Sequence, residues 1–285
     1  MENKKLNMTK VSCAAAAMAF SMAAVGCSTS STDTITSSLG MTASNKAATV
    51  AMRPSLLDLI MPKAHALTPS AIVDSVGTSI ALSSAWVVIK EVEFEATETP
   101  GADEVDGAEI SFRGPYFVDL LSNAPTALDS QVVPAGGFQR IKMKLEKAGG
   151  AAVPASAPAA LGSNSIYVAG TLGTGGASRV FVFQFDDGTE LNVGGPAAVT
   201  PVDGGQVLVE INFSDIFKQI DMSTVANNEV ISSSNRHAAA NLCPNIDASA
   251  NDIYTCMRKG LEKHADVGED SDHSGSLDAT ENKVK

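Results

Sequence analysis

The sequence has few aromatic residues. They make up 5% of the chain, with a single tryptophan, whereas Ala, Gly, Ser and Thr are abundant. This composition favours one principal domain with loose segments around it over two large packed domains. The hydrophobic share of 44% and the charged share of 18% are nevertheless ordinary for a globular protein, and they exclude a wholly disordered chain.

Positive charge is also scarce. The chain carries 20 Lys and Arg against 32 Asp and Glu, which gives a formal net charge of −12. An acidic balance of this size repels phosphate backbones and favours divalent cations. We therefore expect no nucleic-acid partner.

The common catalytic motifs are missing. The sequence contains no G-x-S-x-G elbow, no H-E-x-x-H zinc motif and no phosphate-binding loop. The glycine-rich stretch at 170–176 precedes the strand-like RVFVFQF rather than a helix, so it predicts a hairpin turn. Asp186 and Asp187 stand before Gly188, as in a turn. We expect a protein that is not an enzyme, with a hydrolase of unrecognised site as the less favoured alternative.

A long apolar run is missing from the N-terminus. The run Ala14 to Gly26 is shorter than the about 20 residues that span a bilayer. Lys4, Lys5 and Lys10 precede it, as in secretory signals. We therefore predict that residues 1–26 are a signal peptide and that the protein is exported.

The end of this signal, Ala24-Val25-Gly26-Cys27, resembles the bacterial lipobox, in which cleavage precedes a cysteine that receives lipid. The resemblance implies lipidation of Cys27. Ser28 after this cysteine implies sorting to the outer membrane or cell surface. Cleavage by an ordinary signal peptidase, which leaves Cys27 as a free thiol, is the alternative.

Two segments after the signal have different characters. Residues 27–67 begin with a Ser-, Thr- and Ala-rich stretch without an apolar period, which predicts a tether to the membrane. Residues 68–232 contain short runs of alternating apolar and polar residues. Within QRIKMKLE, for example, Ile141, Met143 and Leu145 share one face.

Similar period-two patterns recur along residues 68–232. AWVVIKEVEFE places Trp86, Val88, Val92 and Phe94 on one predicted face, and NSIYVAG, RVFVFQF and QVLVEINF supply further strands. Turn signals containing Gly separate many of these runs. The pattern predicts a mainly β fold, an antiparallel β-sandwich with a small C-terminal helical calcium-loop module.

Part of this region resembles a β-rich domain of unknown function found in exported bacterial lipoproteins. In that domain a first strand is followed by an Asp-Leu-Leu segment, a Pro-x-Gly turn and an alternating basic strand. The resemblance covers residues 79–147 best. The matching residues are Asp119, Leu120, Leu121, Pro134, Gly136, Phe138, Arg140 and Leu145. It implies a transthyretin-like or carbohydrate-module-like sandwich and brings no catalytic residues.

The C-terminal stretch DSDHSGSLDATE at 270–281 matches the twelve-residue EF-hand calcium loop position by position. Oxygen-bearing side chains occupy positions one, three and five, glycine occupies six, and Glu occupies twelve. Ca²⁺ takes about seven hard oxygen ligands, and glycine permits the sharp turn. The predicted calcium ligands are Asp270, Asp272, Ser274, the carbonyl of Ser276, Asp278 through a water, and Glu281.

The surroundings of this loop are less typical. Residues 240–285 predict one helix leading into it, with Ile253, Cys256, Met257 and Leu261 on one face. Only four residues follow Glu281, and no second loop of this kind occurs. A lone loop either docks on its own domain or pairs between molecules. The alternative is a solvated acidic tail.

Cys243 and Cys256 remain after Cys27 is assigned to lipid and Cys13 to the signal. An oxidising compartment favours a disulfide between them, which closes a loop of about 14 residues and contributes about 3 kcal/mol. Zinc is the weaker interpretation, because no Cys-x-x-Cys occurs.

The sequence thus predicts a lipid-anchored calcium-binding protein with a binding or structural sandwich. Its expected partners are the membrane, through the lipid, and a glycan or an envelope protein. In one alternative the sandwich binds carbohydrate or another envelope polymer and calcium is only structural. Exposed aromatics starting from Trp86 or Tyr116 would favour the sugar binder, and a cleft with two facing carboxylates would favour the hydrolase.

Overall fold

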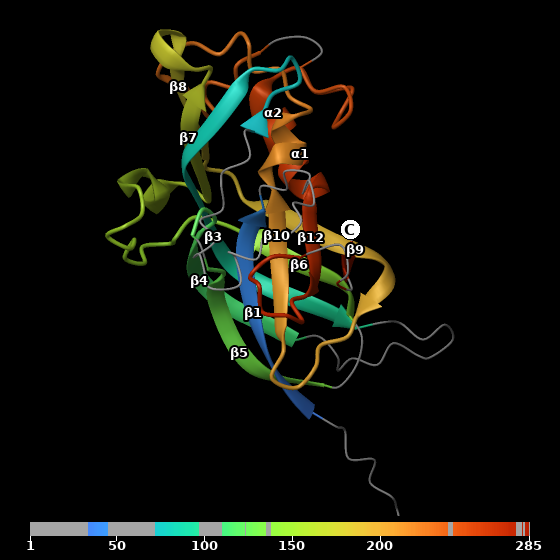
Figure 1. The fold of residues 1–285 in the computed structure, drawn as a ribbon. Helices are drawn as coiled ribbons and strands as arrows, with labels where there is room; N and C mark the ends of the chain where they lie inside the picture. The colour runs from blue at the N-terminus through green and yellow to red at the C-terminus, as the bar shows by residue number, and fades with distance from the viewer. Residues whose placement is uncertain are drawn as a thin grey trace, which may run out of the picture. The chain divides into compact units, whose positions relative to one another are not determined.

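The computed structural model describes residues 34–44, 72–96, 110–122, 124–134, 138–238, 242–277, 281 and 283–284. The predicted signal peptide, the lipid site Cys27 and the loop residue Asp278 lie outside them. The described residues are mainly β-strands in two sheets, as the sequence predicted (Figure 1).

In the part of the chain that the structure describes, the first sheet has five strands in the spatial order β13-β12-β10-β1-β5. Their bounds are β1 Thr34–Ser44, β5 Thr126–Pro134, β10 Gln206–Asn212, β12 Ala265–Glu269 and β13 Lys283–Val284. The pairs are antiparallel except for β1 with β10, which are parallel. This sheet therefore brings together strands from both ends of the described chain.

The second sheet has eight strands among the described residues, in the order β11-β8-β7-β3-β6-β9, with β2 and β4 also pairing with β3. Their bounds are β2 Ile72–Val73, β3 Ser79–Ala96, β4 Ile110–Asp119, β6 Phe138–Leu145, β7 Ile166–Leu172, β8 Arg179–Phe185, β9 Thr189–Val199 and β11 Glu229–Ile231. Here the parallel exception is β11 with β8. The predicted strands at 85–95, 139–146, 164–170, 179–185 and 206–213 all coincide with observed ones, apart from residues at their ends.

The two sheets enclose one main hydrophobic core, as in a sandwich. Met41, Val209 and Val267 of the first sheet belong to the same buried cluster as Val87 and Phe183 of the second. The alternation expected for β6 is present, because Ile141, Met143 and Leu145 are buried while Lys142 and Lys144 are only half-buried.

Strand β3 departs from its predicted alternation. Val92 and Phe94 lie in the main core, but Trp86 and Val88 lie in a second cluster on the other face of the sheet. The pairing register shifts between Ile89 and Glu91. A bulge of this kind adds one residue and exchanges the two faces of the strand. The prediction that these four side chains share a face is therefore wrong.

The predicted tether is also wrong for residues 34–44. These residues form β1, which pairs with β10 on one side and β5 on the other (Figure 1). Leu39 and Met41 are buried in the core. A strand between two neighbours obtains its backbone hydrogen bonds from both, so few large apolar side chains suffice to hold it.

Within the described residues, two α-helices accompany the sheets, α1 Phe213–Phe217 and α2 Ile253–Lys263, with short 3₁₀ turns at Ala159–Ser163 and Gly175–Ala177. The side chain of Asp252 caps α2 by accepting a 2.6 Å hydrogen bond from the backbone N of Thr255. The predicted apolar face of α2 is buried. Arg and Lys side chains remain at its more exposed positions.

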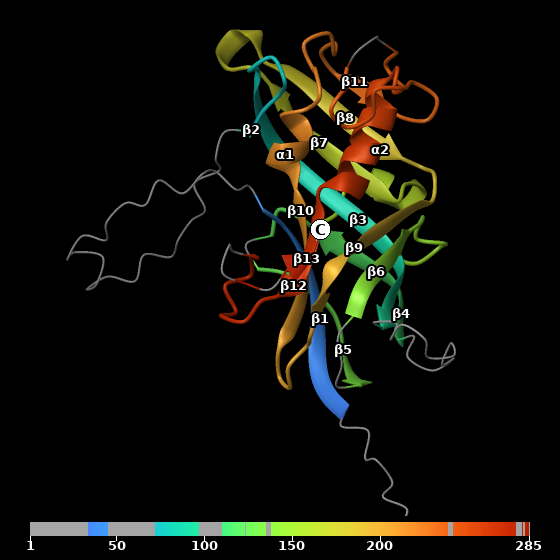
Figure 2. The ribbon, with the colours of Figure 1, turned by 90° about the vertical axis from the view of Figure 1, so that its right-hand side faces the viewer.

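A disulfide joins Cys243 to Cys256, the pair that the sequence suggested. Cys256 lies on the buried face of α2, and both residues are in the main core. The bond ties the segment before α2 to the helix, which in turn leads into β12 (Figure 2). Since β12 and β13 belong to the same sheet as β1, residues 240–285 are not a module separate from the sandwich.

Candidate metal centre

The predicted calcium loop connects β12 to β13. These two strands pair antiparallel, with Val267 opposite Val284 and Gly268 opposite Lys283. The EF-hand expectation of a helix on each side is therefore wrong, because a strand leads into the loop and another strand follows it. Helix α2 ends at Lys263, and the short sequence ADVGE, with a β-branched residue and a glycine, continues as a strand.

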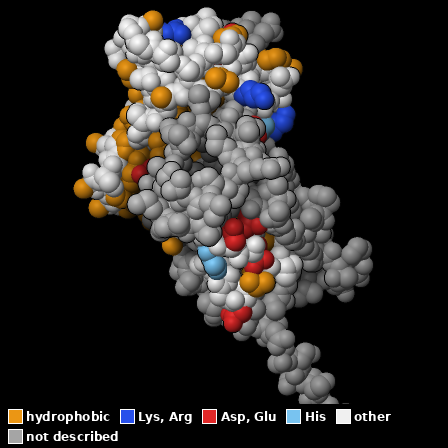
Figure 3. All heavy atoms as spheres, viewed as in Figure 1, with side chains coloured by type: hydrophobic (Ala, Val, Ile, Leu, Met, Phe, Trp, Pro, Cys, Tyr) orange, Lys and Arg blue, Asp and Glu red, His pale blue; other side chains and the backbone are white. Residues whose placement is uncertain are grey.

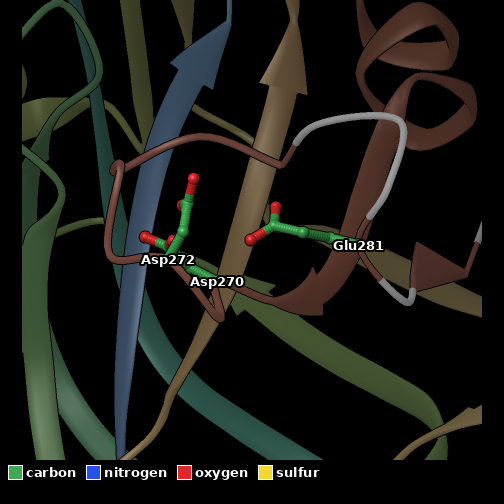
Figure 4. A group of neighbouring side chains, drawn as sticks. All are labelled: Asp270, Asp272 and Glu281. Carbon is green, nitrogen blue, oxygen red and sulfur yellow. The ribbon is translucent and has the colours of Figure 1, made fainter.

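Three predicted ligands come together. One carboxylate oxygen each from Asp270, Asp272 and Glu281 can be chosen so that all lie within 4.8 Å of one another (Figure 4). Two oxygens bound to one Ca²⁺ lie at most about 5 Å apart, twice the usual Ca–O distance of about 2.5 Å. The spacing of these three oxygens is therefore compatible with ligands of one calcium ion.

Hydrogen bonds inside the loop hold Asp270 in place. Its Oδ1 accepts the backbone N–H of Ser274 at 3.0 Å, and its Oδ2 accepts that of Gly275 at 2.8 Å. The hydroxyl of Ser274 donates to the carbonyl oxygen of Ser276 at 3.1 Å. The fifth and seventh predicted ligand positions are therefore neighbours in the structure.

Glu281 closes the ring of donors. Its Oε1 accepts hydrogen bonds from the backbone N and the hydroxyl of Ser271, at 2.8 and 3.3 Å. These hydrogen bonds bring the twelfth position of the loop next to its second position, Ser271. His273 at the fourth position is exposed, as expected for an outward residue.

The sharp turn of the loop depends on Gly275. Its φ of +79° lies in the left-handed region, which a residue without Cβ adopts readily. A Cβ at this position would lie 2.8 Å from Cδ of Pro125, just before β5. The loop therefore reaches across the outer face of the first sheet, and Figure 4 shows it passing in front of β1 and β10.

Burial controls the electrostatics of Asp270, whose side chain is shielded from solvent. Burial raises the pKa of this carboxyl; the N–H groups of Gly275 and Ser274 act in the opposite direction, and Asp272 and Glu281 raise the pKa further. Holding negative charges close together in this shielded place is unfavourable in free energy, and a bound cation would offset that unfavourable free energy. Acidic side chains also gather in this part of the view in Figure 3.

Two further buried acids lie beneath the loop, and sequence reasoning missed them. Glu210 of β10 and Asp266 of β12 stand opposite each other in the antiparallel ladder, 1% and 9% exposed. Glu210 Oε1 accepts the backbone N–H of Leu277, which is itself fully buried. The signal for Glu210 was present in the sequence, because it is the only charged residue within QVLVEIN.

Solvent borders the site on one side. An open hollow of about 130 Å³ lies between the turn at 202–205 and the loop start at 269–273, and Asp270 is among its lining residues. An ion can therefore reach the carboxylates without opening the core.

The features that would favour the two alternative functions are not found where they were expected. Trp86 is 7% exposed and packs in the second cluster, and Tyr116 packs against the main core. Asp187 accepts a 2.8 Å hydrogen bond from the hydroxyl of Tyr254. Neither aromatic side chain thus offers a sugar platform, and one of the two adjacent acids is engaged with a tyrosine.

No family model, no curated protein and no solved structure matches this chain. Among the described residues, no helix has the length and apolar character needed to cross a membrane.

Proposed function

We propose that this protein is an exported, lipid-anchored lipoprotein that binds calcium through residues 270–281 and acts by binding or as a structural element. The observation that carries the calcium proposal is the approach of Asp270, Asp272 and Glu281 to within 4.8 Å at loop positions one, three and twelve. The anchor rests on the sequence before residue 28.

The chemistry of the donors supports calcium over zinc. All the candidate ligands are carboxylate, hydroxyl or carbonyl oxygens, and Ca²⁺ prefers such hard oxygens in a flexible shell. The only described cysteines, Cys243 and Cys256, are joined in a disulfide and cannot act as thiolate ligands. Ser274 and the carbonyl of Ser276 would complete the set together with the three acids.

The position of the loop indicates what calcium does. The loop lies between two strands of the first sheet, and it approaches Glu210 of β10 and Pro125, which precedes β5. Calcium would hold the loop across the outer face of that sheet and neutralise part of the acidic cluster. Its role is then to stabilise the body of the protein that the lipid holds at the outer membrane or cell surface.

The expected affinity is modest. A single loop without a partner loop belongs with extracellular modules, which bind in the range of roughly 10⁻⁴ to 10⁻³ M. At about ten times the dissociation constant, the ion would stabilise the folded state by about 1.4 kcal/mol.

Hydrogen exchange with and without calcium tests this proposal. We expect millimolar calcium to slow exchange of the amides at 270–277 and of β12, because both depend on the loop. Strand β8 in the second sheet is the internal control and should change little. Unchanged exchange at 270–277 would contradict calcium binding by this loop.

A further inference from the structure

A second group of polar side chains lies apart from the calcium loop, between Thr224 and His237. His237 Nδ1 lies 2.7 Å from Oε1 of Glu229, and His237 Nε2 lies 3.0 Å from Oγ1 of Thr224. The three residues form a continuous chain of carboxylate, imidazole and hydroxyl. This is the arrangement by which a base activates a nucleophilic hydroxyl while a third group orients the base.

The carboxylate end of this chain is held from several sides. Glu229 Oε2 accepts the backbone N–H of Ala226 at 2.7 Å. Burial acts against the charged form of Glu229, but the hydrogen bonds from His237 and Ala226 outweigh it and keep the pKa of this carboxyl below its ordinary value. Glu229 is therefore an acceptor for a proton on Nδ1 of His237, and in the tautomer that carries this proton Nε2 can accept the proton of Thr224.

The backbone of His237 fixes the position of its imidazole ring. His237 has a φ of +51°, unusual for a residue other than glycine, and its carbonyl oxygen accepts the N–H of Ile253, the first residue of α2. Non-glycine residues in this region occur disproportionately at functional sites. The conformation turns the His237 ring between Glu229 and Thr224, where its side chain is only 14% exposed.

A positive charge contacts the backbone on both sides of Thr224. The guanidinium of Arg179 donates hydrogen bonds to the carbonyl oxygens of Ser223 and Val225, the residues on either side of Thr224. A fixed cation next to a nucleophile can stabilise the oxyanion that forms when a carbonyl is attacked. Thr224 itself is exposed, so a substrate can approach it from solvent.

We propose that Thr224 is an activated nucleophile and that this corner of the second sheet carries an acyl-transfer activity on small, solvent-accessible esters. The hydroxyl oxygen of Thr224 attacks the ester carbonyl, and its proton passes to Nε2 of His237. The bond to the alcohol then breaks, and the alcohol leaves with that proton. Water, deprotonated by His237, hydrolyses the acyl-threonine and restores the hydroxyl. Glu229 is a positioning residue.

This inference goes beyond calcium binding and does not depend on it. None of Thr224, Glu229 and His237 belongs to the loop at 270–281. Chelation of calcium should leave the acyl-transfer rate unchanged, so the two proposals can fail separately.

The test is incubation of the purified protein with p-nitrophenyl acetate, followed by release of p-nitrophenol and by mass spectrometry of the peptides. We expect an acetyl adduct on Thr224. Thr224→Ala should lose the adduct, and His237→Ala should slow acylation by about 100-fold or more, the usual effect of removing a general base. Thr224→Ser should retain the reaction.

Two comparisons separate a positioning role from a structural one. Glu229→Gln should shift the pH profile of the rate while the protein still melts cooperatively. Ser223→Ala removes the neighbouring exposed hydroxyl and should leave rate and adduct unchanged. No adduct on Thr224, or equal acylation by wild type and Thr224→Ala, would overturn the proposal.

Discussion

The backbone N–H of Leu277 donates a hydrogen bond to the side chain of Glu210, 67 residues earlier in the chain, at 3.4 Å. Leu277 occupies the eighth position of the loop, from which an EF-hand loop usually pairs with a second loop. Here the partner is a buried carboxylate of the domain's own sheet. Of the two expectations for a lone loop, docking on its own domain is the one observed.

Gly275→Ala should weaken calcium binding. Alanine at this position must adopt a left-handed φ, and its Cβ would lie 2.8 Å from Cδ of Pro125. The loop should therefore lose about 1–2 kcal/mol of stability. By calorimetry, we expect the dissociation constant for calcium to be roughly tenfold larger than that of the wild type. Gly77→Ala is the matched control, since Gly77 has a φ of +86° with nothing near its Cβ and lies outside the loop. Equal loss of affinity in both variants would contradict the docking against Pro125.

The disulfide should resist alkylation and stabilise the fold. Cys243 and Cys256 are buried and bonded, so neither should react with a thiol reagent until the protein is reduced. Replacement of both by Ser should lower the free energy of unfolding by about 2–5 kcal/mol in denaturant titrations. Full alkylation of the unreduced exported protein would show that the bond is not formed.

Stability should fall in acid partly because of Glu229. Its pKa is lowered in the folded state, so its contribution is present above the unfolded pKa of about 4.3 and is lost as pH falls through the folded value. Glu229→Gln should be less stable than the wild type at neutral pH, and the difference should narrow toward pH 3. Thermal melts of both proteins across this range check the sign. A difference that grows on acidification would contradict it.

Cys27 should carry lipid. A metabolic label with an alkyne fatty acid should enter the wild-type protein, and the protein should fractionate with membranes. Cys27→Ser should lose both properties, whereas Cys13→Ser, which precedes the apolar run, should keep them. Labelling of Cys27→Ser at the wild-type level would remove the proposed anchor.

The sequence predicted where strands form better than it predicted which of their side chains meet the core. Alternation identified β6 and β8 because one face of each strand meets the core, and this signal lies within a few residues. The face of Trp86 was missed because it depends on a bulge that only pairing with neighbouring strands reveals. Strand β1 was missed because its Ser and Thr side chains resemble a linker, and its stability comes from strands far away in sequence.

The candidate sites show the same division. The ligand spacing of the calcium loop is local, so Asp270, Asp272 and Glu281 could be named from the sequence, and the structure brings them together. Glu210 reaches the loop only through the sheet, and Thr224, Glu229 and His237 follow no known motif. Contacts between segments that are distant in sequence or irregular in structure produce no regular residue spacing, so they cannot be predicted from the sequence pattern.

The most direct test of the calcium proposal is a calorimetric calcium titration of the wild type, Glu281→Gln and His273→Ala. Glu281→Gln removes a charge at the closing position and should lose most of the affinity, whereas His273→Ala changes an exposed side chain and should bind nearly as the wild type does. We predict a wild-type dissociation constant of roughly 10⁻⁴ to 10⁻³ M. No heat at millimolar calcium, or equal binding by the wild type and Glu281→Gln, would contradict a calcium site at this loop.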